Sequence, residues 1–125
     1  MDQYDPLNAP DAEDWLALDE SERLALVRRF HRRARVRVPN LTVHAGIHAV
    51  VENQIALGDE TPVGRVAARL MAEGLDRHEA IHAIGAAFIG VIHDITKQAA
   101  TNADPTERYY AELEHLSAER WRQSG

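Results

Sequence analysis

Residues 83–92 read Ala-Ile-Gly-Ala-Ala-Phe-Ile-Gly-Val-Ile and contain no polar side chain. A helix that is apolar on all sides is normally buried on all sides. Ten apolar residues are also fewer than the roughly 20 needed to cross the hydrocarbon core of a bilayer. The stretch therefore predicts the central helix of a bundle, which the flanking sequence extends from Asp76 to about Gln98.

The sequence on both sides of this stretch favours an all-α fold. Apolar residues recur at spacings of three and four, and strand-like alternation does not occur. Asp19 and Glu22 have the spacing of a capping box, and Gly58 and Gly74 are expected to end two helices. We expect a single-domain bundle of four to five helices over residues 19–125, preceded by an irregular N-terminal arm over residues 1–18. The long helices are predicted at residues 19–35, 41–57, 62–73, 76–98 and 104–122.

Composition excludes several classes of function. With 125 residues the chain has room for one compact domain. It contains no cysteine, which excludes disulfides, thiolate metal sites and cysteine nucleophiles. The net charge of −6 argues against a general nucleic-acid coat protein. The acidic N-terminus lacks the pattern of a signal peptide, so we expect a cytoplasmic protein without a membrane partner.

Histidine is the unusual residue: there are seven, against one lysine. His44, His48 and Glu52 are spaced four apart, so on a helix they share one face with apolar residues. His78 and His82 repeat the spacing on the predicted central helix. Two histidine pairs on inward helix faces form a simple nitrogen cage for a divalent ion. We therefore predict that His44 and His48 face His78 and His82, with Glu52 as a further ligand.

Residues 78–82 also match His-Glu-x-x-His, a pattern in which two histidines bind zinc and the glutamate activates water. On that interpretation Glu79 is catalytic. The alternative is that Asp76 caps the helix and Glu79, three residues later, closes a capping box. The isolated histidines have alternatives too, because His31, His93 and His115 are also explained as hydrogen-bonded core residues or as outer-shell groups.

Six arginines lie within residues 28–37, and without them the net charge of −6 would become −12. Such a patch can bind phosphate or nucleic acid. The favoured interpretation is a solvated helix face that pairs with the acidic arm and the last helix.

The segments around Trp15–Glu20, Val27–His31, His44–Gln54 and Arg77–Gly85 resemble a family of small bacterial helical proteins catalogued as domain of unknown function family 1841. The likeness covers most of residues 11–97. The family brings no established activity. The resemblance implies that seven residues belong to one constellation: His31, His44, His48, Glu52, His78, Glu79 and His82.

The expected function is therefore binding of a divalent metal, with zinc first and iron or manganese as alternatives. Three histidines and a water would make a small metal-dependent hydrolase acting on a small-molecule or peptide substrate. Four histidines would instead make a metal-stapled interaction module. A non-haem diiron-type oxidase using Glu52 and Glu79 is a third alternative. Apolar surface on a bundle of this size makes a homodimer a further expectation.

Overall fold

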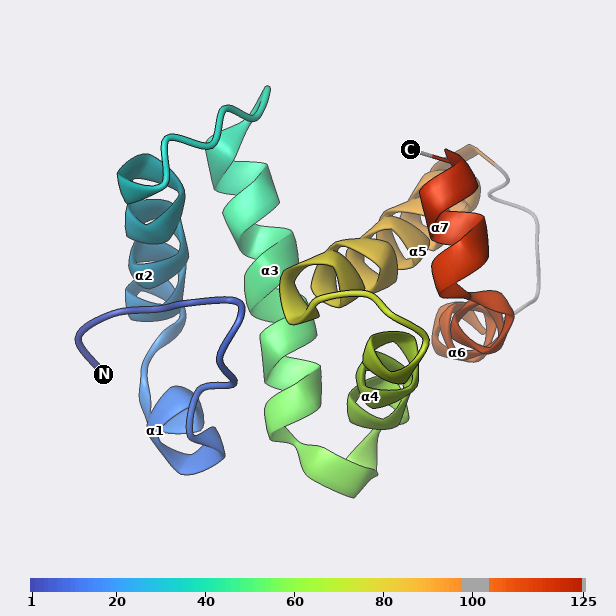
Figure 1. Cartoon of the computed structure of the whole chain (residues 1–125), viewed down its shortest axis with the longest axis horizontal. Coiled ribbons are helices and arrows are strands. Elements are labelled where there is room, and N and C mark those ends of the chain that lie inside the picture. Colours follow the sequence, from blue (N-terminus) through green and yellow to red (C-terminus); the bar gives the residue numbers. More distant parts are fainter. Residues whose placement is uncertain (98–103, 125) are drawn as a thin grey trace. The chain divides into compact units, whose positions relative to one another are not determined.

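The computed structural model describes residues 1–97 and 104–124, and within them the fold is all-α. These residues contain seven α-helices and no strand (Figure 1). The helices are α1 (Ala12–Ala17), α2 (Glu20–Arg33), α3 (Leu41–Ala56), α4 (Val63–Ala72), α5 (Arg77–Lys97), α6 (Pro105–His115) and α7 (Ala118–Ser124). A short 3₁₀ turn, η1 (Gly58–Glu60), follows α3. The predicted fold class is confirmed.

The predicted start and stop signals lie where the helices begin and end. The Asp19 side chain accepts a hydrogen bond from the Glu22 N–H, and Glu22 returns one to the Asp19 backbone, which makes the capping box of α2. Gly58 (φ 64°) and Gly74 (φ 113°) follow α3 and α4 in the left-handed conformation that glycine adopts most easily. The predicted end of the central helix at Gln98 lies outside the described residues.

Two parts of the helix prediction differ from the structure. The predicted irregular arm contains α1, because the Asp11 side chain caps this single turn and a half and Trp15 anchors it in the core. The predicted last helix is divided into α6 and α7, because Leu116 has an extended backbone (ψ 141°). The structure therefore has more helices than the four to five expected.

The chain forms two compact units, Met1–Gly64 and Arg65–Gly125. In the first unit, α1 and α2 both pack against α3 (Figure 1). The buried cluster between them consists of Tyr4, Trp15, Leu26, Val27, Ala45 and Ala49. The N-terminal arm thus supplies two of the largest side chains of this core, and Asn53 of α3 accepts a hydrogen bond from the Trp15 indole at 2.8 Å.

In the second unit, α5 packs against α6, with Phe88 edge-on to Tyr109. Two side chains at the end of α4 form hydrogen bonds with the turn between α6 and α7. The Arg69 guanidinium donates to the carbonyls of Leu113 and Leu116, and the Glu73 carboxylate accepts from the Ala118 N–H at 2.9 Å. A cation thereby lies at the C-terminus of α6 and an anion at the N-terminus of α7, as the helix dipoles favour.

The central helix is most buried in its first half, and it is not buried on all sides as expected. Ala80, Ile81, Ala83 and Ile84 are buried, whereas Ile89 and Ile92 are 49% and 46% exposed. By length and composition alone, residues 77–96 of this helix would suffice to cross a membrane. The buried core helix of a globular protein meets the same criterion.

Candidate metal centre

Three histidine rings gather in the first unit, from two helices. His44 and His48 lie one turn apart on α3, and His31 comes from the last turn of α2. Their ring centres are 4.7 Å apart for His31 and His44, 4.9 Å for His31 and His48, and 4.9 Å for His44 and His48. Two imidazoles bound to one tetrahedral zinc at about 2.0–2.1 Å would have ring centres roughly 5 Å apart. The spacing is therefore compatible with shared coordination.

His31 is held in one orientation by its own helix. The ring is fully buried, and its Nδ1 atom lies 2.8 Å from the Val27 carbonyl oxygen. A carbonyl only accepts hydrogen bonds, so Nδ1 carries the proton in the neutral ring. The nitrogen that this ring can offer to a metal is consequently Nε2.

His48 is oriented by a tyrosine and a glutamate. The Tyr4 hydroxyl donates to Glu52 Oε2 at 2.5 Å, so its oxygen can accept from Nδ1 of His48 at 3.2 Å. The single hydroxyl proton is used on the carboxylate, which makes Nδ1 of His48 the donor and Nε2 the basic nitrogen. All three side chains are at least 99% buried. Histidines that bind a metal usually donate their other ring N–H to a carboxylate, a backbone carbonyl or a water, and here a tyrosine hydroxyl bonded to a carboxylate takes that place.

Glu52, a predicted ligand, therefore reaches His48 through Tyr4. It lies one turn beyond His48 on α3, as its spacing indicated. The role of Tyr4 was missed by the sequence analysis, because 44 residues separate it from His48 and no spacing rule connects the arm to α3. A tyrosine in a segment rich in Asp and Pro gives no periodic signal.

In the second unit, His78 and His82 lie one turn apart near the start of α5, and their ring centres are 4.3 Å apart. Glu79, between them, closes a capping box. Its Oε1 atom accepts from the Asp76 N–H at 3.2 Å, while Asp76 accepts from the Glu79 N–H at 2.8 Å. The predicted alternative for Glu79 is thus present, and its catalytic role stays a prediction.

The histidines of the described residues that could hold a metal ion are His31 and His48 in the first unit, and His78 and His82 in the second. Of the predicted ligands, His48, His78 and His82 belong to this set. His44 and Glu52 lie beside its members but outside it. His31, which the sequence left as an outer ligand or a core residue and which the resemblance placed in the constellation, is one of the four. His93 and His115 are exposed, so neither is the core histidine that the sequence suggested.

Comparison with known protein families, curated proteins and solved structures finds no match for this chain. The resemblance drawn from the histidine motifs stays a prediction.

Proposed function

We propose that the chain binds a divalent transition metal ion through its histidine pairs. The observation that carries the proposal is the orientation of His31 and His48. Each neutral ring uses Nδ1 as a donor to an oxygen, which leaves the basic nitrogen at Nε2, the atom that a metal needs. Two buried imidazoles held in the same tautomer beside a third ring are the arrangement expected of ligands.

The donor set indicates which metals fit. The chain offers imidazole nitrogen and no thiolate, since it has no cysteine. Imidazole suits zinc, copper, iron and nickel, whereas manganese prefers carboxylates and water. Zinc is the first candidate because it accepts four nitrogen ligands in tetrahedral geometry. Iron and then manganese follow as alternatives.

Calorimetric titration of the purified, untagged protein with zinc tests the proposal. We expect binding that is abolished in the double variant His31→Gln/His48→Gln and weakened in His82→Gln, whose ring is only partly buried. The matched control is His93→Gln/His115→Gln, which removes two exposed histidines and should bind as the wild type does. Elemental analysis of the same samples gives the number of ions per chain. That number tells whether the pair His31 and His48 and the pair His78 and His82 bind one ion or two. Wild-type protein that binds no transition metal would exclude the proposal.

A hydrolase reaction is the finer form of this proposal. A metal with an open position lowers the pKa of its bound water and supplies hydroxide near neutral pH. Glu79 would then accept a proton from that water. Because glutamine can keep the hydrogen bonds of a capping box, Glu79→Gln should retain fold and metal and lose turnover on ester or amide substrates. Equal turnover in the variant would leave Glu79 as a helix cap only.

A further inference from the structure

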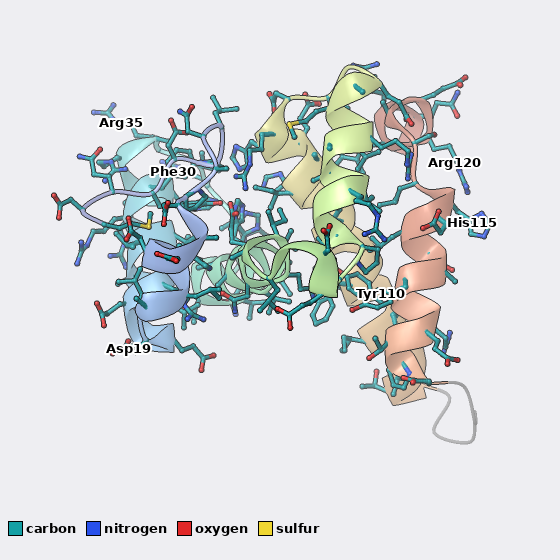
Figure 2. All side chains as sticks on the ribbon, turned by 90° about the horizontal axis from the view of Figure 1, so that it is seen from below. Asp19, Phe30, Arg35, Tyr110, His115 and Arg120 are labelled. Atoms are coloured by element: carbon teal, nitrogen blue, oxygen red, sulfur yellow. The ribbon has the colours of Figure 1, made fainter. Side chains whose placement is uncertain are left out.

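The C-terminal end of α2 and the turn after it carry a dense group of arginines. We call Arg28, Arg29, Arg32, Arg33, Arg35 and Arg37 the arginine patch. All except the half-buried Arg28 are exposed. Within α2, Arg28 lies one turn from Arg32 and Arg29 one turn from Arg33, so the helix presents two adjacent rows of guanidinium groups. Asp19 lies just before α2 and Arg35 just after it, and Figure 2 labels both.

Within the first unit, the ion pairs that the sequence suggested between these arginines and the acidic arm do not occur. None of the six forms an ion pair with a carboxylate of residues 1–64. Arg33 donates a side-chain hydrogen bond to the Tyr4 carbonyl at 3.4 Å, and this contact involves no opposite charge. Like charges crowded together repel each other, and a bound polyanion would relieve that repulsion.

Arg35 lies in the turn that closes α2. It has a φ of 57°, the only positive value at a non-glycine among the described residues, and it directly follows the last turn of α2. Glycine adopts this conformation at the ends of helices with least strain. Here the Val36 N–H donates to the His31 carbonyl at 3.0 Å, so this conformation closes the helix with a hydrogen bond and leaves the Arg35 side chain exposed at its end.

We propose that the arginine patch binds the phosphate backbone of a double-stranded nucleic acid. A guanidinium group can donate two hydrogen bonds to the oxygens of one phosphate. The basic residues of the patch are all arginines. Single-strand binders stack bases on exposed aromatic rings. The aromatic ring in the patch, Phe30, is instead packed edge-on to Tyr4. A duplex, which offers phosphates and no free bases, is therefore the partner that fits.

A membrane surface fits less well. Basic helices that lie on bilayers need an apolar face beside the basic one, and that face inserts among the lipids. The apolar face of α2 is occupied, because Leu26 and Val27 are buried in the core of the first unit.

Binding of the full-length chain to a fluorescent 20-base-pair duplex, made once as DNA and once as RNA, tests the inference by anisotropy at low and rising salt. For B-DNA, log K falls with log salt by about 0.9 per phosphate contacted, so five exposed arginines give a slope of about −4.5. Affinity should then fall about 500-fold between 50 and 200 mM salt. The DNA and RNA arms show which duplex is preferred, and tight binding to either supports the inference.

The variant Arg29→Gln/Arg32→Gln/Arg37→Gln should lose about three units of that slope. The control Arg65→Gln/Arg120→Gln/Arg122→Gln has the same net charge but lies outside the patch, and should keep the wild-type slope. Arg35→Gly separates charge from folding: it should unfold at the same or higher urea concentration than the wild type and still bind the duplex more weakly. The inference is overturned by equal losses in the two triple variants, by the absence of binding at 20 mM salt, or by binding to anionic vesicles without binding to a duplex.

Discussion

Tyr4 is the residue on which the geometry of the first unit depends most. Its ring packs against Trp15 and Phe30, and its hydroxyl joins Glu52 to His48. The phenol both completes the core and sets the tautomer of a proposed ligand. The ring does the packing and the hydroxyl makes the hydrogen bonds, so the hydroxyl can be removed while the ring stays in the core.

We therefore predict that Tyr4→Phe weakens zinc binding by about 10- to 100-fold, the usual cost of losing an outer-shell partner. Competition with a chromophoric chelator measures the affinity at a temperature well below unfolding. Tyr110→Phe, which removes a hydroxyl from α6 in the second unit, is the control and should bind zinc normally. An unchanged affinity in Tyr4→Phe would show that His48 does not depend on this hydroxyl.

At the residue scale, the sequence predicted the histidines on α3 and α5, left the role of His31 open and gave no sign of the role of Tyr4. A spacing of four locates residues on one helix face, and three of the predicted ligands belong to the set that could hold a metal. His31 is isolated in the sequence among arginines, so only the packing of α2 on α3 shows that it lies beside His44 and His48.

At the scale of the elements, the end of α4 organises the turn between α6 and α7. Arg69 bonds two carbonyls of that turn and Glu73 bonds the Ala118 N–H, while the two side chains form an ion pair at 2.9 Å. Helix ends leave carbonyls without intrahelical partners, so a guanidinium placed there replaces water with a fixed donor.

We predict that Arg69→Ala lowers the free energy of unfolding by about 1–3 kcal/mol, because two hydrogen bonds from a charged donor are lost. Urea denaturation followed by circular dichroism measures the change. Arg120→Ala removes an exposed arginine that bonds one carbonyl, that of His115, and should cost less. Equal costs in the two variants would mean that Arg69 acts as an ordinary surface residue.

The capping box of α2 should make stability depend on pH. Hydrogen bonds from the Glu22 N–H, and then from the Ser21 hydroxyl, lower the pKa of Asp19. A carboxyl with a lower pKa in the folded chain stabilises the fold above its ordinary pKa of about 4 and loses that contribution as the pH falls through the folded value. Glu73 behaves alike, because the Ala118 N–H and then Arg69 lower its pKa.

We expect Asp19→Asn, which can still cap the helix, to lose less stability than the wild type when the pH falls from about 5 to 3. Urea midpoints across this range provide the comparison. Glu73→Gln should show the same reduced dependence. If the urea midpoints of all three proteins fell by the same amount over this pH range, Asp19 and Glu73 would not be the source of the pH dependence.

At the scale of the whole molecule, metal binding should be coupled to folding. A ligand that binds only the folded chain stabilises it by about 2.7 kcal/mol at 100 times its dissociation constant. We therefore expect zinc to raise the urea midpoint of the wild type and an added chelator to reverse the shift. Because metals bind imidazole in its neutral form, the shift should shrink in acid.

The variant His31→Gln/His48→Gln should show no zinc-dependent shift, whereas His93→Gln/His115→Gln should shift as the wild type does. A wild-type urea midpoint that changes neither with added zinc nor with added chelator would contradict a metal held by the folded chain.

The sequence alone determined the all-α class, most helix ends and the two histidine pairs. These features are local: a capping box spans four residues, a glycine stop one residue, and a helix face one turn. For the same reason the sequence found the chemical alternatives for Glu79 but did not choose between them.

The tertiary structure decided which distant groups meet. It brought Tyr4 of the arm to His48 and Glu52, placed His31 beside the rings of α3, and exposed His93 and His115 to solvent. Within the first unit, it also left the arginine patch without the ion pairs to the acidic arm that the composition suggested. These outcomes depend on the packing of segments far apart in the chain, and packing is set by the shape of the whole core rather than by any periodicity within one segment.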